Sequence, residues 1–207
     1  MNFSQLCQQR RSVHHYLPNK TIEQNLWSKV FELVRLTPSG YNAQPWEFLV
    51  IEDMKRREHL QSLSFGQKQI TEASAVVLVL GDANIGRRSK ETMADWVKYG
   101  HAKVESAATY QASMEKERSL NQRKMMARRS TCLAAMTFMY ACQYYGLATC
   151  PMMGFEQQKV AKWLALPEDI FPVMMITVGY EDESKRLERL PRREIEDFVH
   201  WEKLGDL

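Results

Sequence analysis

The stretch at residues 37–46, Thr-Pro-Ser-Gly-Tyr-Asn-Ala-Gln-Pro-Trp, constrains the fold of this chain more than any other. A helical pattern ends where it begins, because Pro38 disfavours helical geometry at the residue before it. A mostly apolar run at 46–51 follows and predicts a strand that is central in its sheet. The loop is either an ordinary connection or a surface that presents backbone groups and the side chains of Ser39 and Asn42 to a flat polar ligand.

Two further apolar runs, at 73–81 and 171–180, predict buried strands, because they are long and rich in β-branched residues. A shorter strand-to-helix transition is expected at 147–155. The strands are separated by helices of uneven length, which favours an α+β layer architecture over a regular β-α-β series. Without repeats or a linker, the chain is expected to form one domain over residues 1–207.

Capping patterns predict where two helices begin. Thr21 and Gln24 have the spacing of a capping box, and so do Ser119 and Gln122. The helix after Ser119 is hydrophobic nearly all round, which predicts burial inside the subunit or against a partner. A helical pattern also returns near the end of the chain, at 195–204.

The segment at 82–125 is polar and helix-prone, with Trp96 and Tyr110 interspersed. It is too polar to lie in the core throughout. We expect either a helical excursion near the active site or a solvated surface segment.

Composition excludes several classes of protein. The net charge of +3 is small and does not indicate a nucleic-acid partner. The N-terminal residues lack the pattern of a signal peptide, and the apolar runs are too short to span a membrane, so we expect a cytoplasmic protein without a membrane partner. The four cysteines form no C-x-x-C pair, and none of the five histidines has metal-ligand spacing with another ligand, so no metal site is expected.

A polar cluster near the start of the chain has the chemistry of a phosphate site. In an extended segment, residues two apart share a face, so Arg10, Ser12 and His14 point one way and Arg11 the other. One guanidinium, one hydroxyl and one imidazole on a single face can grip a phosphate through charge-assisted hydrogen bonds. The alternative is a solvated basic turn.

The chain contains no G-x-x-x-x-G-K, G-x-G-x-x-G or G-x-S-x-G motif. A bound cofactor is therefore the best candidate to carry any chemistry. A second basic cluster, Arg189, Arg192 and Arg193, lies at the opposite end of the sequence, and two amides, Gln67 and Gln69, lie between. A phosphate gripped from both ends of the chain, with a flat heterocycle against loop backbone and amides, is what a flavin mononucleotide (FMN) site needs.

The order of these motifs resembles the nitroreductase family of FMN-dependent flavoproteins. The pattern R-R-S-x-H is followed by a helix and then by T-P-S-G-Y-N-A-Q-P-W-E-F. Later matches keep the family order: G-Q-x-Q, C-P-M-M-G-F, V-M-M-I-T-V-G-Y and a terminal R-R-x-I-x-x-F-V. The resemblance spans essentially the whole chain. It implies a nitroreductase-like α+β fold with a central mixed or antiparallel sheet flanked by helices, and an intertwined homodimer with FMN at the interface.

The resemblance also implies a set of cofactor contacts, carried over by position. The ribityl phosphate would be held by Arg10, Arg11, Ser12 and His14, with help from Arg192 and Arg193. The flavin would be lined by Pro38, Ser39, Gly40 and Asn42, the first three reaching it from the partner subunit. The pyrimidine edge would meet Gln67 and Gln69, and flavin N5 would lie by Met153 and Gly154, with a backbone N–H as donor. Candidate acceptor contacts are Tyr41, Trp96 and Tyr110; Tyr41 could equally be an ordinary core or surface residue.

Two positions depart from the family pattern. Members often have Arg or Lys where His14 stands, and a Lys near where Gln69 stands. A neutral amide stabilises negative charge on a reduced flavin less than an ammonium group does, so we predict a lower flavin potential than in lysine-bearing relatives.

The reaction that the resemblance implies is ping-pong. NADH or NADPH passes hydride to the flavin and leaves, and a nitroaromatic or quinone-like small-molecule acceptor is then reduced in the same place. Positioning and electrostatics suffice, so no catalytic side chain is assigned. Three alternatives stay open: a flavin or quinone reductase or another branch of the family, a non-catalytic FMN-binding protein, and a basic module that binds nucleic acid.

Overall fold

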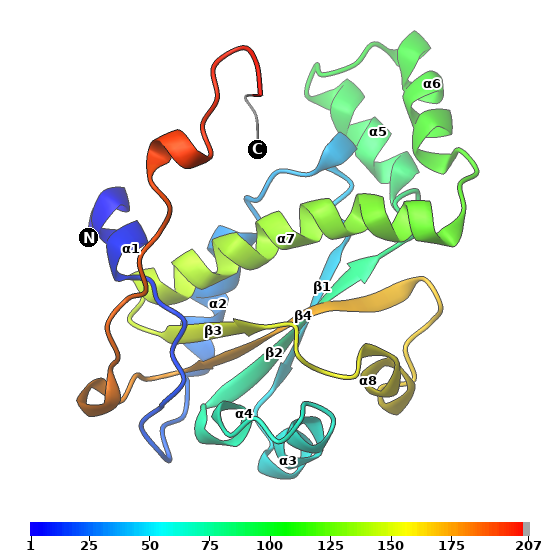
Figure 1. Ribbon diagram of the computed structural model, residues 1–207. Helices are drawn as coiled ribbons and strands as arrows, with labels where there is room; N and C mark the ends of the chain where they lie inside the picture. Colours follow the sequence, from blue (N-terminus) through cyan, green and yellow to red (C-terminus); the bar gives the residue numbers. More distant parts are fainter. Residues whose placement is uncertain (205–207) are drawn as a thin grey trace.

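The structure is a computed structural model that describes residues 1–204, and it has the predicted α+β fold (Figure 1). Four strands form one sheet in the order β1-β2-β4-β3, and each neighbouring pair is antiparallel. The strands are β1 Trp46–Ile51, β2 Ala75–Asp82, β3 Ala148–Met152 and β4 Ile170–Gly179. Of the mixed and antiparallel arrangements expected, the described residues form the antiparallel one.

Strand β2 is buried along its whole length, as its sequence predicts. Its side chains alternate between two apolar clusters, with Val77 and Val79 in one and Val76 and Leu78 in the other. Both faces of the sheet are therefore covered, which gives a three-layer arrangement. Pro172 lies in β4 where the β2–β4 register shifts, one of the few places where a proline fits inside a sheet.

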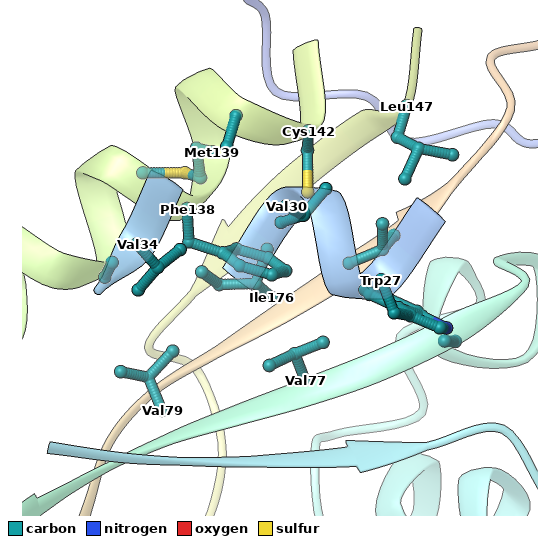
Figure 2. Packing of buried hydrophobic residues seen from close by; sticks show 14 of the residues in the cluster. Trp27, Val30, Val34, Val77, Val79, Phe138, Met139, Cys142, Leu147 and Ile176 are labelled. Atoms are coloured by element: carbon teal, nitrogen blue, oxygen red, sulfur yellow. The ribbon is translucent and has the colours of Figure 1, made fainter. Parts of the chain in front are cut away.

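Helices α2, Gln24–Val34, and α7, Leu120–Tyr144, cover the first face of the sheet (Figure 2). Phe138 of α7 is fully buried, and its ring lies 6.4 Å from Trp27 and 5.6 Å from Phe31, centroid to centroid. Truncating such a residue to alanine costs about 3–5 kcal/mol. Helix α7 is not buried all round within one chain, since the Leu133 side chain is about half exposed.

The second face of the sheet is covered by α3, Met54–Ser62, α4, Gln69–Glu72, and α8, Gln157–Trp163. The buried guanidinium of Arg57 in α3 donates to the carbonyls of Ile70, Thr71 and Ala73 at the end of α4. These carbonyls have no helical partner, so one side chain of α3 fixes where α4 ends.

The polar segment at 82–125 contains two helices, α5 Ser89–Lys98 and α6 Val104–Glu115, which project beyond one end of the sheet (Figure 1). Arg87 ties them to the sheet: its Nε donates to Asp82 Oδ2 at 2.6 Å and its Nη2 to Asp169 Oδ2 at 2.5 Å. The helical excursion is therefore anchored at its base.

The N-terminal part of the chain runs beside β3, and the C-terminal arm lies against that part. Helix α1, Phe3–Gln9, leads into an extended strap at 10–16, and β4 leads into an arm at 186–204 (Figure 1). Residues 1–204 also contain three short 3-10 turns, Gly40–Asn42, Glu183–Lys185 and Ile195–Asp197.

Three sequence expectations are wrong. Strand β1 lies at an edge of the sheet rather than in its centre. Helix α2 begins at Gln24 with Glu23 as its N-cap, so the box from Thr21 does not form, whereas the box of Ser119 does. The predicted helix at 195–204 is only a single 3-10 turn.

Candidate functional site

The strap at 10–16 is bound along β3 by its backbone. Ser12 forms a parallel bridge with Thr149, and the Val13 N–H donates to the Thr149 carbonyl at 3.0 Å. Val13 and Tyr16 are buried and anchor the strap, which fixes the direction of the side chains between and before them.

The side chains of the strap differ in their internal contacts. Arg11 donates from Nη2 to the Leu187 carbonyl, and His15 Nδ1 lies 3.6 Å from a Glu72 carboxylate oxygen. By contrast, the side chains of Arg10, Ser12 and His14 make no hydrogen bond to any of residues 1–204. The face predicted to grip a phosphate is thus the one without an internal partner.

The strap and the arm together line a cavity of about 300 Å³. Arg189 Nη2 donates to the carbonyls of Gln8 and Arg10, each at 2.7 Å, and so holds the arm against the end of α1. The cavity is lined by residues of the strap, Arg10 to His15, and by residues of the arm and the loop before it, including Glu181, Asp182, Lys185, Arg186, Arg189 and Arg192.

The Arg10 guanidinium is held in an unfavourable place for a cation. Burial lowers its pKa, and the neighbouring charges of Arg189 and Arg192 lower it further. Arg186 does not add to the available charge, because Glu181 and Glu183 both accept from it. A bound anion would relieve this repulsion.

Arg193 lies apart from the cavity lining. Its guanidinium carbon is 5.6 Å from the centroid of the Phe198 ring, and its Nη1 donates to the Asp197 carbonyl at 3.4 Å. Of the two arginines expected to help at the phosphate, only Arg192 lines the cavity in this chain.

A second group of polar residues lies where α4 begins. Gln67 Nε2 donates to the Gly154 carbonyl at 2.7 Å and to the Ser64 carbonyl at 3.1 Å. Gln69 Nε2 donates to Gln67 Oε1 at 3.2 Å and approaches Met152 Sδ at 3.8 Å. Gln67 therefore uses its donors on the backbone, which makes it a bridge between α4 and the turn after β3.

That turn presents an unused backbone donor. The Gly154 N–H makes no hydrogen bond within residues 1–204, and the Met153 side chain is 74% exposed. The turn is fixed on its far side, where the Glu156 N–H donates to the Leu63 carbonyl at 2.9 Å. The turn therefore offers a backbone N–H that no group within residues 1–204 uses.

The loop at 37–45 is strained in an unexpected place. Gly40 does not have a positive φ, whereas Tyr41, Asn42 and Gln44 have φ of 57°, 56° and 47°. The Ser39 hydroxyl accepts from the Gln44 N–H at 2.9 Å and closes the turn. Three residues close to the glycine, rather than the glycine itself, therefore adopt the left-handed conformation.

Pro38 and Gly40 are exposed, and an added Cβ at Gly40 would meet no atom within 4 Å. The Asn42 side chain is also exposed, and its Oδ1 accepts only a long hydrogen bond, 3.3 Å, from Gln44 Nε2. This edge of the loop faces open space in a single chain.

The other edge of the loop packs on the helical excursion. Tyr41 Oη and Ser113 Oγ share a hydrogen bond at 3.0 Å, and the Tyr41 ring lies 6.2 Å from Trp96. Trp96 lies 5.5 Å from Tyr110, so the three candidate acceptor residues form one aromatic row.

Within one chain, the structure brings the strap together with the arm, and Gln67 together with Gly154, but it brings the loop at 37–45 to neither group. Strap and arm line one cavity, and Gln67 contacts Gly154. The loop at 37–45 contributes no residue to that cavity and no described hydrogen bond to Gln67, Gln69 or the 153–154 turn.

Two arginines that matter here were not assigned a contact from the sequence. Arg189 was noted only as part of a basic cluster, and no sequence signal shows that it binds the carbonyls of α1. Arg57 has no signal at all, since it lies in a charged helix of low apolar content. Sequence patterns report which residues are charged, not which backbone carbonyls need a donor.

Residues 1–204 give little support for a reactive cysteine or a metal site. Burial raises the pKa of Cys150 to about 11, so the thiol stays protonated and unreactive at neutral pH. No group of three or more His, Cys, Asp or Glu residues is placed to hold a metal ion, and no helix of the described chain is long and apolar enough to cross a membrane.

Comparison with known proteins gives consistent matches. The family model described as "Nitroreductase family" matches residues 7–180. A relative from Bacillus subtilis (strain 168), named "Putative NAD(P)H nitroreductase MhqN", is 30% identical over 96% of this chain and 98% of its own length.

Solved structures agree with the sequence matches. A Bacillus subtilis structure described as the "putative nitroreductase ydfN" superposes with a TM-score of 0.89, at 29% identity over 96% of this chain and 98% of the other. A structure from Exiguobacterium sibiricum, described as a "putative nitroreductase in complex with FMN", gives a TM-score of 0.85 at 26% identity, with 97% of both chains covered.

Proposed function

Because the chain belongs to the nitroreductase family, a family of oxidoreductases, we propose that it is an FMN-dependent enzyme that oxidises NAD(P)H and reduces nitroaromatic or quinone-like acceptors. One observation carries the proposal. Arg10, Ser12 and His14 line a cavity, their side chains make no hydrogen bond within residues 1–204, and Arg189 and Arg192, which also line it, place positive charge near Arg10. A dianionic phosphate fits that donor set.

The remaining residues fit the other parts of FMN. Gln69 and the acceptor oxygen of Gln67 supply amide chemistry for a pyrimidine edge, and the Gly154 N–H supplies a donor for flavin N5. Gln67 has a second task, since its bond to the Gly154 carbonyl joins the start of α4 to the turn that carries this N–H.

The exposed edge of the loop at 37–45 supports a two-subunit site. Pro38, Ser39, Gly40 and Asn42 lie away from the cavity of their own chain, so we assign the first three to the flavin of a partner subunit. The proposed assembly is a homodimer. The arm at 186–204 agrees with it, because it exposes apolar side chains that a lone chain leaves in water: Leu187, Leu190, Ile195, Phe198, Trp201 and Leu204.

When bound, FMN supplies two-electron chemistry at N5, accepting hydride from the reductant and delivering it to the acceptor. The chain's residues bind and orient: the strap and arm hold the phosphate, the amides and the 153–154 turn fix the ring, and the aromatic row Tyr41, Trp96 and Tyr110 forms the wall toward the acceptor. Reductant and acceptor use the same place in turn, which is a ping-pong scheme.

The purified full-length protein tests the proposal directly. We expect flavin absorbance, loss of that absorbance with NADH or NADPH under anaerobic conditions, and its return on addition of a nitroaromatic compound or a quinone. Double-reciprocal plots at several acceptor concentrations should be parallel. A protein that takes up no added FMN refutes the proposal.

The same titration separates the alternatives. A flavin or quinone reductase returns the absorbance with its own acceptor and not with nitroaromatics. A non-catalytic FMN-binding protein takes up FMN but is not reduced by either nucleotide. Sedimentation at micromolar concentration, with and without FMN, tests the homodimer.

A further inference from the structure

Tyr41 has a backbone conformation that its side chain does not favour. Its φ of 57° and ψ of 14° lie in the left-handed region, which bulky residues rarely adopt. Such a conformation persists only where the surrounding structure over-determines it. The contacts of Tyr41 should therefore show what holds the loop at 37–45 in shape.

Those contacts come from the helical excursion. The Tyr41 hydroxyl is hydrogen-bonded to Ser113 of α6 at 3.0 Å, and the Tyr41 ring lies against Trp96 of α5 at 6.2 Å. Two residues along, Ala43 is buried in a cluster with Met93 of α5 and Met114 of α6. One loop residue thus reaches both helices through a polar and an aromatic contact, and a second loop residue is enclosed by both.

The helices that hold the loop are themselves fixed. Arg87 bonds Asp82 and Asp169 at the base of the excursion, and the Ser89 hydroxyl donates to the Glu115 carboxylate, which joins the start of α5 to the end of α6. The excursion can therefore act as a rigid support for the loop.

We propose that Tyr41 is a positioning residue: through its bond to Ser113 and its packing on Trp96, helices α5 and α6 hold the loop at 37–45 in the left-handed shape that presents Ser39 and Asn42 to the flavin. We call the contacts of Tyr41 with Ser113 and Trp96 the clamp. The clamp is a property of the chain, and only its effect on FMN rests on the proposed function. Helices α5 and α6 would then set the geometry of the flavin site and also line the place where the acceptor binds.

The decisive comparison is Tyr41→Ala against Tyr41→Asn. Both remove the ring and the hydroxyl, but asparagine adopts the left-handed conformation readily and alanine does not. We expect the FMN dissociation constant to rise roughly tenfold in Tyr41→Ala, and to stay within about twofold of the wild type in Tyr41→Asn. Rescue by asparagine distinguishes backbone positioning from lost packing and from a contact with the acceptor.

A readout without FMN tests the clamp alone. The Ala43 N–H donates to the Gly40 carbonyl at 3.0 Å, and the Gln44 N–H donates to Ser39 Oγ. In the apo protein, hydrogen exchange at Ala43 and Gln44 should quicken in Tyr41→Ala and not in Tyr41→Asn. If the wild type takes up no FMN, the proposed function fails, while this exchange comparison still decides the clamp.

Milder variants guard against misfolding of Tyr41→Ala. Tyr41→Phe and Ser113→Ala each remove one partner of the hydrogen bond, and each should weaken FMN binding about two- to fivefold, with the double variant no weaker than either single one. Tyr99→Phe, at an exposed tyrosine after α5, is the matched control and should change nothing. Equal FMN binding and equal exchange in Tyr41→Ala and Tyr41→Asn overturn the proposal, and so does full additivity of the two mild variants.

Discussion

The cavity at the strap and the loop at 37–45 differ in how many internal contacts their key residues make. In the cavity, the Arg10 side chain makes no hydrogen bond within residues 1–204, and the charges of Arg189 and Arg192 oppose its own. In the loop, strained residues are held by many internal contacts, among them the bond of Tyr41 to Ser113.

The difference shows what each region requires from its surroundings. In the cavity, burial and two neighbouring positive charges disfavour the charged form of Arg10. A bound anion would offset both effects. The loop is already determined before any ligand arrives, and a ligand gains from its fixed shape. One region is therefore tested by removing charge and the other by changing the backbone.

The largest effect is expected at the cavity. Arg10→Ala should raise the FMN dissociation constant tenfold or more, because it removes a charge-assisted contact of about 1.5–3 kcal/mol. Arg11→Ala should have a smaller effect, since the Arg11 guanidinium is occupied by the Leu187 carbonyl. Titration of apo protein with FMN, followed by quenching of flavin fluorescence, measures both.

The dependence of FMN affinity on ionic strength is a control for the comparison of Arg10→Ala with Arg11→Ala. FMN affinity of the wild type should fall as salt rises, and the fall should be shallower in Arg10→Ala. Equal affinities for the two alanine variants would show that the strap does not divide its faces as described.

Next in size is a contrast between two arginines. Arg57 is buried, with carbonyls as partners, so Arg57→Met should lower the free energy of unfolding by about 1–3 kcal/mol by leaving those carbonyls unpaired. Arg10→Ala should leave the stability of the apo protein unchanged or slightly higher, because it relieves repulsion. Urea unfolding of both apo variants checks this, and a destabilised Arg10→Ala would contradict it.

A smaller effect is expected at Gln69, which belongs to neither the cavity nor the loop. It concerns the midpoint potential of bound FMN. Gln69→Lys places a cation where the wild type has a neutral amide, so the midpoint potential of bound FMN should rise by about 30 mV, equivalent to ~1.4 kcal/mol for a two-electron couple. Spectroelectrochemical titration measures the potential. Gln158→Lys, at an exposed position in α8, is the matched control, and an unchanged or lower potential in Gln69→Lys refutes the role given to this residue.

The smallest effect concerns the loop backbone. Asn42 has a φ of 56°, which asparagine tolerates and alanine does not, so Asn42→Ala should destabilise the apo protein by about 1 kcal/mol. Asn42→Gly should be nearly neutral. Thermal unfolding of the two variants compares them, and a Gly variant less stable than the Ala variant would show that strain is absent.

Sequence reasoning succeeded where a local rule decides the structure. The β-branched content of residues 73–81 predicted a buried strand, and β2 is buried along its whole length. The box at Ser119 formed because its spacing is itself the capping geometry.

Sequence reasoning failed where distant parts of the chain decide. Strand β1 is apolar because helices cover both faces of the sheet. An apolar sequence therefore does not show whether a strand lies in the centre of the sheet or at its edge. The pattern at 195–204 is helical in period, but a short helix gains its stability mainly from packing, and the side chains of this segment are largely exposed. The strain at Tyr41 likewise depends on helices more than fifty residues away, as the separation of Tyr41 from Ser113 shows.

The cavity at the strap also fixes an order of events during synthesis. Its lining comes from residues 10–15 and 181–192, so the first wall leaves the ribosome long before the second exists. Arg189 can bind the end of α1 only after residue 189 itself has been made. A nascent chain that has not yet reached residue 181 therefore lacks one wall of this cavity, and we expect it to bind an anion there less well than a chain that has passed residue 192.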